Sequence, residues 1–266
     1  MCVTAVPEPA TPIPAATVLL VRDGGEGLEV FMVKRHDDIA FAGGALVFPG
    51  GKASQDDYDA AIADVADDAT GFAADMHALA VAAIREAFEE AGVLIARDAA
   101  TGELIGAARL DSLQQHRQQI EKGEISLHAL LLREGLRLAC DELVYFAHWI
   151  TPKPQPKRFD THFFLARVPE GQTGQHCGRE AVESVWVKPR DVVADRTQWK
   201  LMFPTRLNLM KLARARTVDE ALAAARAAPP VTVEPWIESG ADGKFFRIAD
   251  DAGYEETRVP LRDTAE

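Results

Sequence analysis

Residues 85–93 read REAFEEAGV, and this stretch decides the fold. Together with the apolar spacing before it, the stretch predicts a helix over 75–91 that ends at Gly92. At about 100° per residue, three carboxylates share one face of that helix. They are Glu86, Glu89 and Glu90. The opposite face is apolar and anchors the helix in a core, through Ile84, Phe88 and Ala91.

A solvated acidic face is the commoner explanation for such a helix, but two physical costs favour a cation. Like charges three and four residues apart repel, by about a few tenths of a kcal/mol per pair. Glu89 and Glu90 also lie in the last turn, where the helix dipole disfavours anions by about 0.3–1 kcal/mol. Clustered carboxylates are hard oxygen ligands that suit Mg²⁺, with Mn²⁺ as the alternative. The sequence therefore predicts a magnesium site on this face.

Arg85 directly precedes the first glutamate and keeps its charge at any physiological pH. It could orient one of the glutamates or contact a phosphate. The alternative is a surface ion pair with Glu89, four residues further on, worth only about a few tenths of a kcal/mol.

A glycine-rich turn over residues 43–52, GGALVFPGGK, precedes the acidic helix. Glycines after a strand let the backbone approach a ligand or ion, although a plain tight turn explains them equally well. The turn is not a P-loop, because Leu46 stands five residues before Gly51 and Ala53 replaces the magnesium-binding Ser or Thr. This excludes the usual kinase and GTPase assignments, and the other glycine pairs do not fit a dinucleotide-binding turn.

The 266 residues are 47% hydrophobic and 26% charged, which excludes a disordered or fibrous protein. With 41 acidic and 29 basic residues, the formal net charge is -12 and repels polyanions. We therefore expect no nucleic-acid partner and no membrane partner. Three cysteines suit a reducing compartment, and no apolar run approaches the ~20 residues of a membrane span. We expect a cytoplasmic protein, whose oligomeric state stays open, a homodimer included.

The order of strand-like and helix-like segments predicts an α+β or mixed α/β sandwich. Strands are expected over 15–22, 28–35, 45–48, 93–96, 143–150, 159–168 and 184–187, and closing helices over 204–216 and 218–227. We divide the chain into a flexible lead-in over 1–14, a main domain over 15–228 and a C-terminal extension over 229–266 with a hairpin around Gly243. The main domain carries an acidic insertion over 53–74 and a helical insertion over 107–140.

The segment FPGGK followed by REAFEEAGV resembles the signature of the Nudix hydrolases, G-x5-E-x7-R-E-U-x-E-E-x-G-U, where U is bulky and apolar. The second half matches at every functional position. The first half departs from the pattern, because Gly51 and Arg85 are 34 positions apart instead of 14. Asp57 stands six residues after Gly51 and His77 eight before Arg85, so the role of the first glutamate is left unassigned.

The long insertion resembles the Nudix subgroup that includes a coenzyme A diphosphatase. Segments elsewhere are similar to the same subgroup, so the resemblance covers roughly residues 15–215. They are ATVLLVRD, LEVFMVKR, FAGGALVFPGGK, the run from Trp149 through KRFDTHFF, and EAVESVWVKP.

This resemblance implies an α/β/α sandwich with a mixed β-sheet and magnesium-assisted hydrolysis of a diphosphate joined to another group. Carried across, Glu86, Glu89 and Glu90 would bind the metal together with the carbonyl of Gly51, and Arg85 would belong to the catalytic set. The carboxylate that acts as general base stays open. A further acid from outside the signature is expected at Glu183, with Glu180 as the alternative. Either residue could instead be an ordinary charge at the edge of a strand.

A small-molecule diphosphate is the expected partner, with coenzyme A or acyl-coenzyme A first. ADP-ribose, dinucleotides, nucleotide sugars and a non-catalytic nucleotide-binding role are the alternatives. An acidic protein needs a basic rim around such a substrate. The candidates are Arg35, Lys52 and Arg158, with Lys34 and Lys157 beside them. Three aromatic residues could stack on a base or simply fill the core: Trp149, Phe159 and Phe163.

Overall fold

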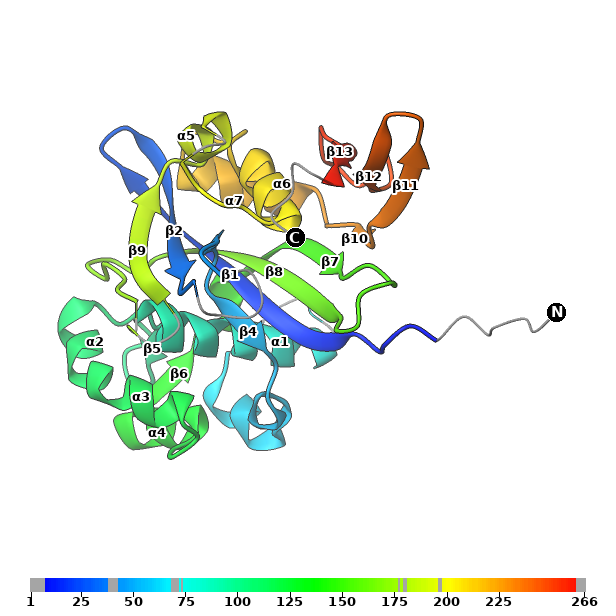
Figure 1. Cartoon of the computed structure of the whole chain (residues 1–266). Coiled ribbons are helices and arrows are strands. Elements are labelled where there is room, and N and C mark those ends of the chain that lie inside the picture. The colour runs from blue at the N-terminus through cyan, green and yellow to red at the C-terminus, as the bar shows by residue number, and fades with distance from the viewer. Residues whose placement is uncertain are drawn as a thin grey trace.

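Figure 1 shows the computed structural model of the chain, which describes residues 8–37, 43–67, 72, 74–176, 178, 181–195 and 198–261. The strands of its main sheet are β1 (Ile13–Gly24), β2 (Gly27–Arg35), β3 (Leu46–Val47), β4 (Gly50–Lys52), β7 (Val144–Ile150), β8 (Phe159–Arg167), β9 (Ala181–Val187) and β10 (Thr232–Val233). The sheet runs in the order β10-β7-β8-β1-β2-β3, with β4 paired to β1 and β9 to β2. It is mixed, because β1 is parallel to β8 and antiparallel to β2.

The central strand β1 is apolar on both sides, as expected of a strand buried between two layers. Val18 and Leu20 belong to one core cluster, whereas the alternating Leu19 and Val21 belong to the other. Successive side chains of a strand point to opposite faces, so these two clusters fill the two faces of the sheet.

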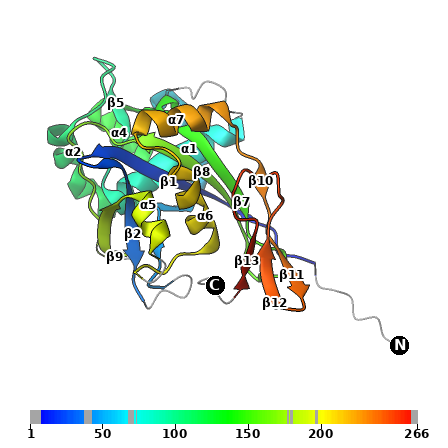
Figure 2. The same cartoon turned by 90° about the horizontal axis from the view of Figure 1, so that it is seen from above.

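Helices cover both faces (Figures 1 and 2). One face carries α1 (Ala74–Glu86), its continuation η3 (Ala87–Ala91), α2 (Ala107–Leu113), α3 (Arg117–Glu121) and α4 (Leu127–Glu134), together with the small sheet of β5 (Ala96–Asp98) and β6 (Leu136–Leu138). The other face carries α5 (Pro189–Ala194), α6 (Phe203–Leu212) and α7 (Val218–Ala227). The fold is therefore the α/β sandwich with a mixed sheet that the sequence predicts.

The C-terminal segment forms part of the same body. Its strand β10 extends the main sheet beside β7, and β11 (Trp236–Gly240), β12 (Gly243–Arg247) and β13 (Arg258–Pro260) make a three-stranded sheet of their own. The hydroxyl of Tyr254 accepts a hydrogen bond from Trp149 Nε1 at 3.0 Å and donates one to Asn208 at 2.7 Å. The C-terminal segment, to which the sequence assigns no role, thus completes the core on the side of the sheet that carries α6.

Most expected elements are present, with local differences. Residues 93–95 are buried but lie outside any strand, and β5 begins only at Ala96. The expected helix over 204–216 ends at Leu212. Short 3-10 helices occupy the insertions: η1 (Gln55–Tyr58), η2 (Ala60–Val65), η4 (Gln114–His116) and η5 (Cys140–Glu142). In the part of the chain that the structure describes, every helix is too short or too polar to cross a bilayer.

Candidate functional site

The acidic helix does not end as a regular α-helix. After Glu86 it widens into the π-helical turn η3, which carries Glu89 and Glu90 and stops at Gly92. Gly92 adopts the left-handed conformation with φ 62°, and its N–H donates to Phe88 O at 3.0 Å. Such π turns inside helices are frequent at functional sites, because they re-aim side chains without breaking the helix.

Arg85 draws the carboxylates of this region together. Its guanidinium donates to Glu86 Oε1 at 2.9 Å and to Glu89 Oε1 at 3.2 Å, both from the same terminal nitrogen. A second nitrogen donates to the carbonyl of Lys52 at 2.9 Å, which ties the helix to β4. The Arg85 side chain is only 11% exposed, so these contacts are partly shielded from water. Arg85 therefore positions the carboxylates rather than forming a surface pair.

Asp57 is the residue whose role the sequence leaves unassigned. It is 3% exposed and forms a bidentate pair with Arg85, at 2.9 Å from Nε and 3.0 Å from a terminal nitrogen. Bidentate carboxylate–guanidinium pairs are among the strongest charge-assisted contacts in proteins. The sequence feature that points to Asp57 is its spacing. It stands six residues after Gly51, where the signature has its first glutamate, with Asp in place of Glu.

The glycine turn meets the acidic helix directly. The N–H of Gly50 donates to Glu90 Oε2 at 3.0 Å. A Cβ at Gly51 would overlap the carboxylate of Glu86, so only glycine allows this approach. The turn is therefore more than a connection, because it brings backbone polar groups against the glutamates.

The electrostatics of the site favour an added cation. Asp57, Glu86 and Glu89 all contact one guanidinium, which offsets only one of three negative charges. Burial raises the pKa of Glu86 to about 7, against the opposing pull of Arg85. Burial also raises the pKa of Glu89, with Arg85 again opposing. The carboxylates form a set of oxygen donors that fits a hard divalent cation.

A cavity of about 620 Å³ lies beside these carboxylates and includes Glu90 and Gly50 in its wall. Basic side chains line it at Arg35, Lys157 and Lys200. Among the described residues, the aromatic ones that line it are Phe48, Trp149, Phe159, Phe163, Phe203 and Phe246. Volumes of roughly 300–1,000 Å³ are typical of small-molecule sites, so the cavity can take a sizeable ligand with both anionic and apolar parts.

Of the residues expected to form a basic rim, only some line the cavity. Arg35 lines the cavity, and the exposed Lys52 contributes its carbonyl to Arg85. Arg158 is 6% exposed and donates instead to two carbonyls and to Glu234 Oε1, the last at 2.6 Å. Its neighbour Lys157 lines the cavity instead, with Nζ 5.2 Å from the centre of the Phe159 ring.

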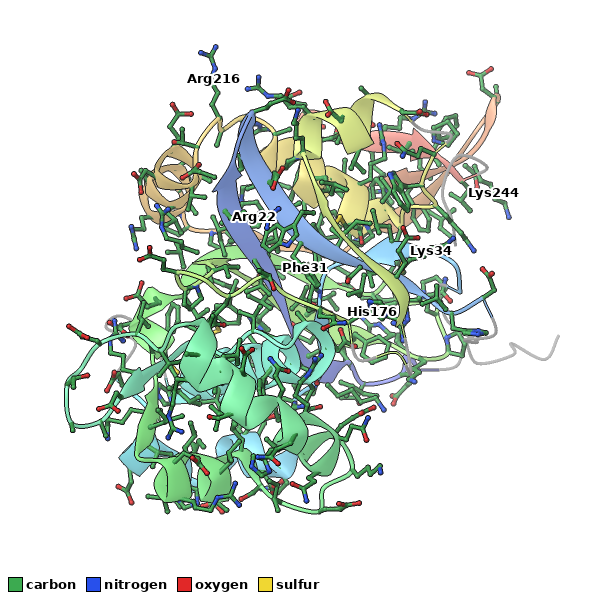
Figure 3. All side chains as sticks on the ribbon, turned by 90° about the vertical axis from the view of Figure 1, so that its left-hand side faces the viewer. Arg22, Phe31, Lys34, His176, Arg216 and Lys244 are labelled. Atoms are coloured by element: carbon green, nitrogen blue, oxygen red, sulfur yellow. The ribbon has the colours of Figure 1, made fainter. Side chains whose placement is uncertain are left out.

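The expected extra acid, Glu183, is exposed on β9, where it pairs in register with Lys34 of β2. Figure 3 labels Lys34 on that strand. Its alternative, Glu180, lies outside the described residues. Lys200 is a basic cavity residue that sequence reasoning missed. It comes from the segment before α6, and its Nζ donates to Gly43 O at 3.0 Å.

Comparisons with known proteins agree with this geometry. The model of the NUDT19 Nudix domain family matches residues 67–207, which is more than half of the chain. The chain belongs to the Nudix family. A Nudix hydrolase from Alicyclobacillus acidocaldarius, known from its crystal structure, is 30% identical, with a TM-score of 0.72 over 82% of this chain and 99% of that one.

A curated Nudix relative, "Putative nudix hydrolase 7" of Caenorhabditis elegans, is 28% identical over 176 residues. The match covers 66% of this chain, which thus spans about half (52%) of that relative's length. Nudix hydrolases generally use divalent metal ions and act on nucleoside diphosphate derivatives. The oxygen donors around Gly51 and Glu86 fit such an ion.

Proposed function

We propose that this Nudix protein hydrolyses the diphosphate linkage of a nucleoside diphosphate conjugate, with Mg²⁺ and with water attacking phosphorus. The observation that carries the proposal is the position of Glu90. Its carboxylate accepts a hydrogen bond from the N–H of Gly50 in the glycine turn. Glu90 also follows Glu89 in η3 and lines the cavity. A ligand in the cavity therefore meets the acidic helix.

Glu86, Glu89 and Glu90, with the Gly51 carbonyl, are the proposed metal ligands. When bound, Mg²⁺ neutralises charge on the diphosphate and makes a coordinated water more acidic. Arg85 holds two of the glutamates in place through the contacts described above. A carboxylate of this set accepts the proton of the attacking water, and Glu183 remains the candidate for an additional acid.

The cavity wall suggests how the substrate is held. Arg35, Lys157 and Lys200 offer positive charge to phosphate oxygens, which offsets the overall acidity of the protein. Trp149 and Phe159 provide flat apolar surface for a base or an alkyl chain. We take coenzyme A or an acyl derivative as the first candidate, on the resemblance of the long insertion and the flanking segments to a coenzyme A diphosphatase subgroup.

The substrate proposal is tested by mass spectrometry of products. The protein is incubated with Mg²⁺ and equal concentrations of coenzyme A, ADP-ribose, NADH and diadenosine polyphosphates, beside an EDTA control and the Glu90→Gln variant. We expect 3′,5′-ADP and phosphopantetheine from coenzyme A. AMP from another compound, with coenzyme A intact, would overturn the substrate and retain the chemistry. Equal product from the wild type and the variant would overturn the assignment of the site.

A cytoplasmic location and a homodimer complete the proposal. The location rests on the small, odd number of cysteines, which suits a reducing compartment. Fractionation of the source cells tests the location. Light scattering in solution tests the dimer, and a mass of 28.9 kDa would contradict it.

A further inference from the structure

A second group of metal-ligating side chains lies apart from the glutamates of the acidic helix. His148 of β7 and two residues of β8, Asp160 and His162, direct one ligand atom each to a common point, with these atoms all within 4.8 Å of one another. The two strands are antiparallel, and His148 pairs with His162 in register. The sheet itself therefore brings the three side chains together.

Both imidazoles face the same carboxylate oxygen. Nε2 of His148 lies 2.5 Å from Asp160 Oδ1, and Nε2 of His162 lies 3.5 Å from the same atom. The rings are stacked, with centroids 4.0 Å apart. Among the residues that the structure describes, no lysine or arginine forms an ion pair with Asp160. The shared oxygen thus has two nitrogen neighbours, and a small widening of the 2.5 Å contact would let one cation bind all three atoms.

The opposite ring nitrogens are each engaged by a hydroxyl. Nδ1 of His148 lies 2.8 Å from Thr232 Oγ1, and Nδ1 of His162 lies 2.8 Å from the Tyr145 hydroxyl. An N–H at Nδ1 can donate to either hydroxyl, which leaves the Nε2 lone pair directed at the common point. Metal-ligating histidines are usually oriented in this way by a partner on the other nitrogen.

We propose that His148, Asp160 and His162 bind a divalent transition metal of the zinc class, at a site separate from the glutamates of the acidic helix. Two imidazoles and one carboxylate suit zinc or a similar ion better than magnesium, which prefers oxygen. A Thr232–His148–Asp160 hydrolytic triad is the rival arrangement. It leaves the second imidazole and its own hydroxyl partner unexplained.

The site lies across the sheet from the cavity. Along β8, Phe159, Thr161 and Phe163 line the cavity, whereas Asp160 and His162 alternate with them and face the other side. Asp75 in the first turn of α1 lies close enough to His162 for its charge to act on the imidazole. The register places the glutamates two strands away. Ala16 of β1 pairs with His162 on one side and with Gly51, which meets Glu86, on the other. At about 4.8 Å per strand spacing, His162 and Gly51 are about 10 Å apart at the backbone.

The solvent access and the neighbours of the cluster suit a structural metal. The side chains of His148 and His162 are 15% and 12% exposed, and that of Asp160 is 34% exposed and leaves an entry path. Thr232 belongs to β10, so a metal here ties the C-terminal segment to β7 and β8. Metal at about 100 times its dissociation constant is expected to raise the melting temperature by roughly 5 °C or more.

The test uses the full chain, stripped with EDTA and returned to excess Mg²⁺ so that the oxygen site is occupied. Co²⁺ is titrated with visible absorption as the readout, and Zn²⁺ is measured by calorimetry and by metal analysis. We expect one equivalent with the d–d absorption of nitrogen-coordinated Co²⁺. Asp160→Asn and His162→Asn should weaken binding by more than about 100-fold, and Thr232→Val by about tenfold.

Controls separate this site from the proposed catalytic one. His128→Asn, on α4, and Glu89→Gln should retain the full equivalent, and metal-free melting temperatures show whether each variant folds. Absence of bound Co²⁺ and Zn²⁺ in the wild type would overturn the proposal. So would unchanged binding in folded Asp160→Asn and His162→Asn, or loss of the equivalent in Glu89→Gln. The hydrolysis assay plays no part in the readout, so failure here leaves the proposed function standing.

Discussion

Replacing Glu86 by Gln should stabilise the metal-free protein at pH 8 while leaving it little changed near pH 4.5. Glu86 is 8% exposed, and burial raises the pKa of its carboxyl from 4.5 to about 7. Between these two pH values the folded chain holds a proton that the unfolded chain has released. Stability therefore falls as the pH rises through this interval and stays constant above it.

The size of the effect follows from the same two values. The interval from 4.5 to about 7, at about 1.36 kcal/mol per pH unit, amounts to about 3 kcal/mol of lost unfolding free energy. The glutamine amide is nearly isosteric and does not titrate. Glu89, whose pKa burial also raises, is present in both proteins, so the difference between them reports Glu86 together with its coupling to Glu89. About 3 kcal/mol corresponds to roughly 6–12 °C in melting temperature for a chain of this size.

Urea denaturation in EDTA at pH 5 and pH 8 measures this difference, with the exposed Glu103→Gln as the control. We expect the gap in unfolding free energy between Glu86→Gln and wild type to grow by about 2.5 kcal/mol from pH 5 to pH 8, because a small part of the effect is already present at pH 5. The control should follow the wild type. A gap that is equal at the two pH values would refute the claim that Glu86 is a strained buried carboxyl.

Three further predictions concern the neighbours of that carboxyl and the cavity. Asp57→Asn removes a buried bidentate partner and should cost roughly 3 kcal/mol in urea unfolding at pH 7, and a loss below about 1 kcal/mol would contradict this. Gly51→Ala places a Cβ against Glu86 and should weaken Mg²⁺ binding roughly tenfold or more in calorimetry with an unchanged circular dichroism spectrum. Lys157→Met should raise KM several-fold at an unchanged melting temperature, whereas Arg158→Met should lower the melting temperature, and the reverse pattern would show that the two roles are exchanged.

The acidic helix could be predicted because its signals are local. The apolar spacing around Phe88 sets the buried face, and the glutamates follow at fixed offsets on the other. Gly92 marks the end at a left-handed residue, as glycine commonly does. The π turn at 87–91 has no such signal, because it depends on how the helix end meets the glycine turn.

Contacts between residues that are far apart along the chain could not be predicted from the sequence. Arg158 and Lys157 are adjacent and equally charged, yet one reaches Ala10 O, 148 residues away, and the other lines the cavity. Lys200 joins the wall only because the chain folds back beside Gly43. Residues 93–95 show a further limit, since a short apolar run fits a buried strand and a buried connection equally well.

We propose that the glutamates of the acidic helix hold the metal used for water attack on a diphosphate. Turnover of the best substrate is measured in ¹⁸O-water at saturating Mg²⁺, for wild type, Glu89→Gln and the exposed control Glu103→Gln. We expect ¹⁸O in a phosphate product of the wild type and the control, and turnover reduced by at least about 100-fold in Glu89→Gln. Wild-type turnover in Glu89→Gln, or the same turnover in EDTA, would contradict the account.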